Sequence, residues 1–109
     1  MSESGGSPTL LFSELAGDPE LDQLVTEFVA ALAERVSALE QVLAAGNLAR
    51  AATLAHQLKG AAGSYGFPLI TEAALRVERI AKEGRNVGAL RDAVTDLAQL
   101  CRRAQPPGG

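Results

Sequence analysis

Four stretches of apolar residues recur at helical spacing along this chain, and only two to four residues separate each stretch from the next. Residues three and four apart lie on one face of an α-helix, so each stretch predicts an amphipathic helix with one buried face. The predicted helices cover residues 19–45, 48–64, 68–83 and 87–104. Because short connections place consecutive helices antiparallel, the sequence predicts an all-α, up-down-up-down four-helix bundle.

Helix-capping and helix-breaking residues separate the four predicted helices. Asp18 can cap the first amides of the first helix, and Pro19 suits its first turn. Gly46 is expected to end that helix, and Asn47 to cap the second one. Pro68 can open the third helix, because a proline at a helix start gives up no intrahelical hydrogen bond.

The predicted domain covers residues 9–104, and a chain of 109 residues has the usual length of a single domain. Residues 9–15 carry four large apolar side chains, and we expect them to form a short extra N-terminal helix. Residues 1–8 and 105–109 are rich in glycine, serine and proline, so we expect a disordered N-terminus and a disordered tail.

Composition and charge argue against several classes of function. A net charge of −3 argues against nucleic-acid binding, which is typical of basic domains. One cysteine, Cys101, and one histidine, His56, cannot make an internal disulfide or a zinc-ligand cluster, so we expect no metal site. No apolar run approaches the roughly 20 residues of a membrane span. We therefore expect a cytoplasmic monomer that does not associate with membranes.

The helix predicted over residues 48–64 carries the only histidine on the side that should face outward. At about 100° per residue, His56 lies roughly 200° from Leu54 on the apolar face. Gly60 and Gly63 lie on the His56 side, although a glycine inside a helix costs roughly 1 kcal/mol relative to alanine. Either these glycines pack closely against a neighbouring element, or they leave the imidazole open to a partner. A surface histidine without chemistry is the simpler alternative.

Three charged residues are candidates for a functional role beside His56. Lys59, one turn further on, would favour the neutral imidazole and attract a phosphoryl group, or it is an ordinary solvated lysine. Glu78 and Lys82 lie four residues apart on the flank of the next predicted helix. A carboxylate that accepts the Nδ1 proton would leave Nε2 as a nucleophile. Alternatively, the two residues form a stabilising surface pair, and periodicity does not decide between these interpretations.

Leu75 lies on the same flank as Glu78, outside the apolar stripe centred on Val77. It either contacts a partner or packs under the short N-terminal helix. In the first case, a flat and weakly hydrophobic docking surface is expected around His56. Its candidate members are Ala49, Ala52, Gln57, Gly60, Gly63 and Leu75.

The sequence Ala-His-Gln-Leu-Lys-Gly at residues 55–60, with Gly66 ten residues after the histidine, resembles the signature of histidine-containing phosphotransfer (HPt) domains. These domains are four-helix bundles that relay phosphoryl groups in two-component signalling. The resemblance extends over most of the chain, from about residue 10 to residue 104. It implies that His56 is the phosphoacceptor, that Lys59 steadies the phosphoryl group, and that Gly60 opens the surface to a receiver domain.

The same resemblance implies roles for two residues of the following helix. The family commonly has glutamine or glutamate 22 residues after the histidine, to hold the imidazole, and a basic residue four positions later; here these are Glu78 and Lys82. The implied partners are response-regulator receiver domains and a sensor histidine kinase, with Mg²⁺ bound by the partner receiver. The chain would then be a phosphocarrier without an ATP-binding site of its own, rather than an enzyme.

Two alternatives to a relay between receivers remain open at this point. A glutamate at the position of Glu78 is also usual in the phosphoacceptor domain of chemotaxis kinases, so the chain could be the phosphoacceptor module of a larger chemotaxis-type or hybrid kinase. It could also be a non-catalytic helical interaction bundle, which would bind a partner without phosphoryl chemistry.

Overall fold

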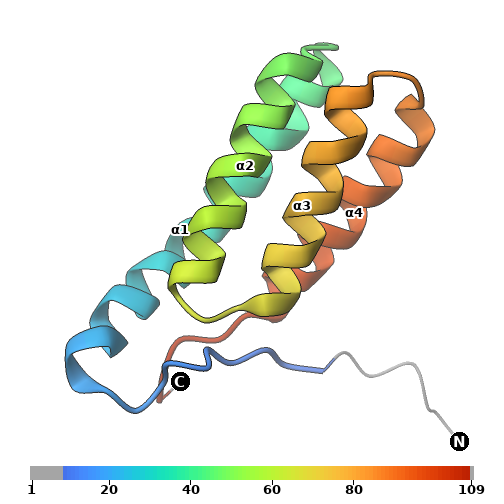
Figure 1. Cartoon of the computed structure of the whole chain (residues 1–109). Helices are drawn as coiled ribbons and strands as arrows, with labels where there is room; N and C mark the ends of the chain where they lie inside the picture. Colours follow the sequence, from blue (N-terminus) through green and yellow to red (C-terminus); the bar gives the residue numbers. More distant parts are fainter. Residues whose placement is uncertain (1–8, 109) are drawn as a thin grey trace, which may run out of the picture.

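The computed structural model describes residues 9–108, which form an antiparallel bundle of four α-helices (Figure 1). The helices are α1 (Pro19–Ala44), α2 (Leu48–Ser64), α3 (Pro68–Glu83) and α4 (Val87–Arg103). α2 packs against α1 and α3, and α4 closes the bundle against α3 and α1. The predicted four-helix architecture is confirmed, and each predicted helix boundary is within one residue of the observed one.

Side chains cap three of the helices, at Asp18, Asn47 and Asn86, and the sequence predicts the first two of these caps. The carboxylate of Asp18 accepts a hydrogen bond from the Glu20 amide at 3.0 Å, at the start of α1. The Asn47 side chain accepts one from the Arg50 amide at 3.0 Å, at the start of α2. Each cap satisfies a first-turn amide that has no partner within its own helix. The caps therefore hold the short connections that keep neighbouring helices antiparallel.

The core contains the apolar faces of all four helices, and Phe28 stands at the centre of an aromatic group. Its ring lies 5.2 Å from that of Tyr65 and 5.8 Å from that of Phe67, between ring centroids. Leu24 and Val87 have the helical spacing of the apolar faces, which predicts that they are buried, but they are exposed, at 44% and 47%. Leu24 lies near the start of α1, which extends beyond the other helices (Figure 1), and Val87 is the first residue of α4.

The prediction of a short helix over residues 9–15 is wrong, because these residues form a strap without helix that runs into a turn at residues 14–17. The Leu11 amide donates to the carbonyl of Arg103 at 2.7 Å, and the Gln105 amide donates to the carbonyl of Leu11 at 2.8 Å. Leu11 thereby forms a parallel bridge with Ala104. Seven residues are too few for a helix that is stable by itself, whereas the extended form can bond to a carbonyl in the last turn of α4. Gln105, which the sequence assigned to a disordered tail, is thus bonded to the domain.

The strap also fastens the connection between α2 and α3. The Ser13 hydroxyl donates to the carbonyl of Tyr65 at 2.6 Å, and the Glu14 amide donates to the carbonyl of Gly66 at 2.8 Å. Ser13 and Glu78 are the only buried polar residues in the described part of the chain. Residues 1–8, which the sequence predicts to be disordered, lie outside the described residues.

Gly66 is required where the strap meets the α2–α3 connection. Its φ is +81°, and a Cβ there would lie 2.7 Å from Ser13 Oγ and 2.9 Å from the Glu14 nitrogen. We expect Gly66→Ala to lower the free energy of unfolding by about 2–4 kcal/mol, through backbone strain and overpacking. Gly60→Ala is the matched control, because its Cβ would meet no atom within 4 Å. We expect that control to stabilise the protein by up to about 1 kcal/mol in urea unfolding; equal effects of the two substitutions would contradict this role of Gly66.

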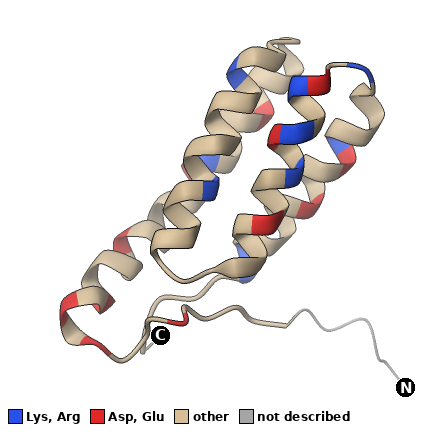
Figure 2. Ribbon diagram, in the orientation of Figure 1, with Lys and Arg blue, Asp and Glu red and all other residues tan. Residues whose placement is uncertain are grey.

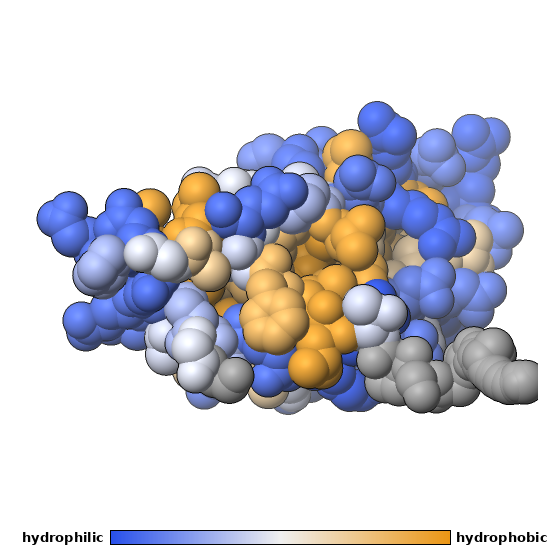
Figure 3. Space-filling model, turned by 90° about the horizontal axis from the view of Figure 1, so that it is seen from below, coloured by the Kyte–Doolittle hydropathy of each residue, from blue (hydrophilic) through white to orange (hydrophobic). Residues whose placement is uncertain are grey.

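Apolar side chains are exposed where the strap crosses the end of the bundle (Figure 3). Leu10, Phe12 and Leu69 are each about half exposed there, at 52%, 54% and 49%. Phe12 and Leu69 also line a small hollow of about 110 Å³. The candidate residues for phosphoryl chemistry, His56, Lys59, Glu78 and Lys82, do not line this hollow.

Candidate functional site

His56 lies in the middle of α2, on the side of the bundle where α2 packs against α3. Its side chain is 64% exposed. The residues beneath it on α2 are small or apolar, and Ala55 and Leu58 are fully packed into the core. The expectation that His56 faces away from the core is therefore confirmed.

One buried carboxylate gathers three nitrogen atoms at this site. Glu78 projects from α3, and its side chain is 6% exposed. Its Oε2 lies 3.0 Å from His56 Nδ1 and 3.0 Å from Lys82 Nζ. Its Oε1 accepts a hydrogen bond from Lys59 Nζ at 2.9 Å. The surface pair between Glu78 and Lys82 does form, but the same carboxylate also reaches His56 and Lys59 on α2.

The two lysines keep Glu78 ionised. The hydrogen bond from Lys59, and then that from Lys82, lowers the pKa of the Glu78 carboxyl to about 2, although burial acts in the opposite direction. An ionised carboxylate can only accept hydrogen bonds, so Nδ1 of His56 must be the donor. The neutral imidazole therefore carries its proton on Nδ1 and a free lone pair on Nε2.

The depressed pKa of Glu78 makes the stability of the fold sensitive to acid. The carboxyl has an ordinary pKa of 4.5 and a folded-state pKa of about 2. Its stabilising contribution is therefore complete above about pH 4.5 and is lost as the pH falls toward 2. We expect urea unfolding of the wild type to lose more stability over this range than that of Glu78→Gln, which has no group to titrate at this position. If the free energy of unfolding fell equally with pH in the two proteins, ionised Glu78 would not be the source of the acid sensitivity.

The two lysines differ in how firmly they are held. Lys59 is 27% exposed, whereas Lys82 is 66% exposed, so Lys82 can leave the carboxylate at little cost. In this arrangement the Lys59 ammonium donates a hydrogen bond to the Glu78 carboxylate. With His56 neutral, two ammonium groups and one carboxylate give the cluster a net charge of +1. A net positive charge of this kind suits an incoming anion.

Small residues leave the approach to His56 open. An added Cβ at Gly60 would meet no other atom within 4 Å, which excludes close packing as the reason for this glycine. A Cβ at Gly63 would lie 3.7 Å from Thr71 Oγ1, an ordinary contact, so Gly63 is likewise not required by packing. Gln57 is exposed on the same helix.

An open hollow of about 440 Å³ lies beside the imidazole. Its lining residues come from α2 and α3, and they are Ala49, Ala52, Thr53, His56, Glu78 and Lys82. Ala49 is exposed as predicted, but Ala52 is only 7% exposed, so it contributes little to an exposed docking surface. Thr53 was not predicted; its helical spacing of three from His56 was the signal that could have identified it.

Leu75 is half-buried on α3, one turn before Glu78. The alternative in which it packs under a short N-terminal helix is wrong, because the strap forms no such helix. Leu75 does not line the hollow beside His56. It lines a second hollow, of about 480 Å³, on the outer face of α3, together with Glu72, Arg76, Arg79, Ile80 and Glu83.

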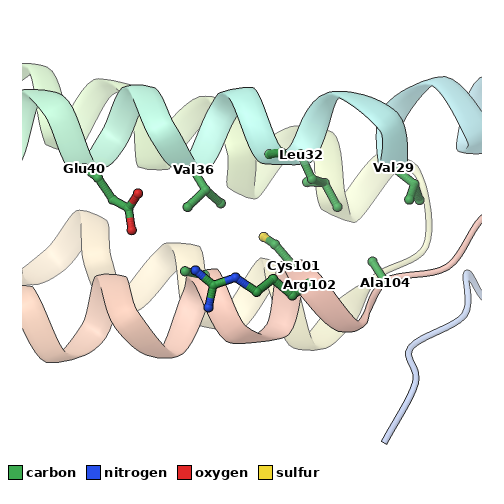
Figure 4. Close-up of a pocket in the computed structure, with 9 residues that line it drawn as sticks. Val29, Leu32, Val36, Glu40, Cys101, Arg102 and Ala104 are labelled. Carbon is green, nitrogen blue, oxygen red and sulfur yellow. The ribbon is translucent and has the colours of Figure 1, made fainter. Parts of the chain in front are cut away.

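A groove of about 350 Å³ between α1 and α4 shows no comparable chemistry (Figure 4). Cys101 points into it from α4, and burial raises the pKa of that thiol to about 12, so it stays neutral. Glu40 and Arg102 also line the groove. Within residues 9–108, no group of three or more possible metal ligands occurs, and no helix has the length and apolar character to cross a membrane.

The chain belongs to the HPt domain family, because the family model described as Hpt domain matches residues 23–105. This match extends from within α1 to the second residue after α4, so residues 9–15 of the strap lie outside it. Domains of this family take part in histidine phosphotransfer in two-component phosphorelays, as phosphocarriers rather than catalysts, and they interact with receiver domains and kinases. No curated protein and no solved structure matches the chain.

Proposed function

We propose that His56 is the phosphoacceptor of this domain. It would accept a phosphoryl group from the aspartyl phosphate of a response-regulator receiver, or from a sensor histidine kinase, and pass it to another receiver. The observation that carries this proposal is the exposed imidazole whose Nδ1 is bonded to buried Glu78 at 3.0 Å. The tautomer that results directs a lone pair from Nε2 toward solvent.

The transfer needs no base to activate the imidazole. In the neutral form with the proton on Nδ1, the Nε2 lone pair attacks the phosphorus, the N–P bond forms, and the P–O bond to the aspartyl carboxylate breaks. No proton leaves Nε2, so the ring becomes a phosphoimidazolium cation with its N–H still directed at Glu78. The negative carboxylate stabilises this positive charge. The second transfer reverses these steps and restores the neutral ring.

The lysines would stabilise the phosphoryl group itself. Lys82 is the more exposed of the two and can move from Glu78 to a phosphoryl oxygen. Lys59 would keep the carboxylate ionised while Lys82 moves, or would join it at the phosphoryl group. The Mg²⁺ needed for transfer from an acyl phosphate is expected on the partner receiver, and this chain would supply no metal.

Incubation of the protein with a phosphorylated receiver and Mg²⁺ tests the proposal. We expect an acid-labile, alkali-stable phosphate that mass spectrometry places on His56. Stable binding of the receiver without any phosphate on the protein would favour the alternative of an interaction bundle. Efficient phosphorylation by a histidine-kinase core but by no receiver would favour a kinase module.

We also propose that Leu75 belongs to the docking surface, because it is half-buried one turn before Glu78 and lines the hollow on the outer face of α3. Leu75→Lys is expected to reduce transfer from a receiver by roughly tenfold, about 1.4 kcal/mol, which is a typical loss for an apolar contact at an interface. Thermal unfolding should change little, since the side chain is already partly in water. A large fall in Tm with normal transfer per folded molecule would instead show that Leu75 has a packing role.

A further inference from the structure

Charge is divided unevenly along this chain. Residues 1–40 contain eight acidic residues and one basic residue, a net charge of −7, whereas residues 41–109 contain nine basic and five acidic residues, a net charge of +4. Figure 2 shows the result: acidic positions predominate on α1, whereas α2 carries basic positions and α3 carries both kinds. α1 alone carries five acidic residues and one arginine, whereas α2 carries Arg50 and Lys59 and no acidic residue.

A protein partner that reaches His56 must cover more than the hollow beside it. Specific interfaces bury about 800 Å² on each partner, and a helix with its side chains is only about 10 Å wide. The contact must therefore spread from α2 onto α1 or onto the outer face of α3. These two directions differ in charge, and that difference can decide the direction from which a partner docks.

On the outer face of α3, Arg79 is the cation that has no ion-pair partner among residues 9–108. Arg76 is paired with Asp96 at 3.1 Å, and Lys82 is paired with Glu78. Arg79 is exposed and takes part in no ion pair within residues 9–108. It lies one turn after Leu75, and the two residues line the same hollow. Glu72 and Glu83 also line this hollow, seven residues before and four residues after Arg79.

We propose that the phosphoryl-exchanging partner docks across α2 and the outer face of α3 rather than across α1, that its contacting face is acidic, and that Arg79 is a specificity-determining contact. This inference rests on the proposed function. A protein that holds an aspartyl phosphate with Mg²⁺ needs further carboxylates for the cation, so its active face is acidic. Such a face is attracted by Arg79 and by the lysines of the His56 cluster, and it is repelled by α1.

Charge reversal at matched positions tests the proposal. We expect Arg79→Glu to lower the second-order rate of transfer from a phosphorylated receiver at least fivefold at low salt, and the loss to shrink as salt is added. Arg91→Glu makes the same charge change on α4; Arg91 is exposed and lies seven residues before Ala98, on the face toward the α1/α4 groove. We expect this control to change the rate less than twofold. Equal losses in the two variants would overturn the role of Arg79.

Two further measurements distinguish a failure of the docking inference from a failure of the proposed function. Glu34→Lys on α1 should leave the rate unchanged or raise it, and a slower transfer would show that the partner docks over α1. Phosphoramidate, a small donor that needs no docking surface, should phosphorylate His56 equally in the wild type and in Arg79→Glu. If neither phosphoramidate nor the receiver phosphorylates wild-type His56, the proposed function itself fails. If His56 is phosphorylated but Arg79→Glu and Arg91→Glu accept phosphate from the receiver at the same rate, only the docking inference fails.

Discussion

Substitution of His56 by glutamine is expected to remove phosphoryl uptake from a phosphorylated receiver entirely. Glutamine has similar length and polarity but no ring nitrogen with a lone pair, so it cannot form the N–P bond. Because the side chain of His56 is 64% exposed, the substitution should change the free energy of unfolding by no more than about 0.5 kcal/mol. Transfer of radiolabelled phosphate, measured beside circular dichroism and thermal unfolding, gives both results on one sample.

The same variant discriminates between the classes of function that the sequence left open. A phosphocarrier loses phosphate uptake with His56→Gln but keeps its affinity for the receiver, because the docking surface is intact. An interaction bundle takes up no phosphate in either form. Phosphate uptake by the glutamine variant at the wild-type rate would show that His56 is not the phosphoacceptor.

Removal of the buried carboxylate should have the second largest effect. Glu78→Ala takes away the acceptor that orients His56 and the counter-charge that stabilises the phosphoimidazolium. A hydrogen bond to a charged group contributes about 1.5–3 kcal/mol, which corresponds to a loss of roughly 10- to 150-fold in the transfer rate. Single-turnover transfer from a phosphorylated receiver in large excess measures this loss without a contribution from weak docking.

Lys82→Ala is the matched control for the carboxylate. Lys82 is largely exposed, and the median contribution of an exposed ion pair is at most about 1 kcal/mol, so a loss of less than about tenfold is expected. Glu78→Gln should fall between the two variants, because its amide can still accept from Nδ1 but can also turn and donate to it, which would favour the wrong tautomer. An order in which Lys82→Ala is the most damaged variant would contradict the central role of Glu78.

The helices could be predicted from the sequence because their causes are local. The apolar spacing lies within each helix, and the capping residues and glycine or proline breaks lie at its ends, so the observed boundaries follow them closely. The strap could not be predicted in this way. Leu11 bonds to residues more than ninety positions away, and such partners leave no trace in local spacing. The four large apolar residues of this segment resemble one face of a helix although two of them, Leu10 and Phe12, face solvent.

The orientation of His56 could also be predicted, since its helix has a clear apolar face. The partners of Glu78 could not, because an angle on a helical wheel does not give the rotation of one helix against the next. In the structure, Glu78 of α3 bonds to His56 and to Lys59 of α2, so it faces α2. The four residues chosen from the sequence, His56, Lys59, Glu78 and Lys82, do lie together, but the bond from Lys59 to the carboxylate was not predicted.

The central claim is tested most directly by identifying which ring nitrogen of His56 carries the phosphoryl group. Long-range ¹H–¹⁵N correlation spectra of the imidazole, recorded before and after phosphorylation, report which nitrogen is protonated and which is bonded to phosphorus. Because ionised Glu78 accepts the Nδ1 proton at 3.0 Å, we expect the Nδ1–H tautomer in the neutral protein and phosphorus on Nε2 afterwards. A neutral ring protonated on Nε2, or a phosphoryl group on Nδ1, would contradict the account.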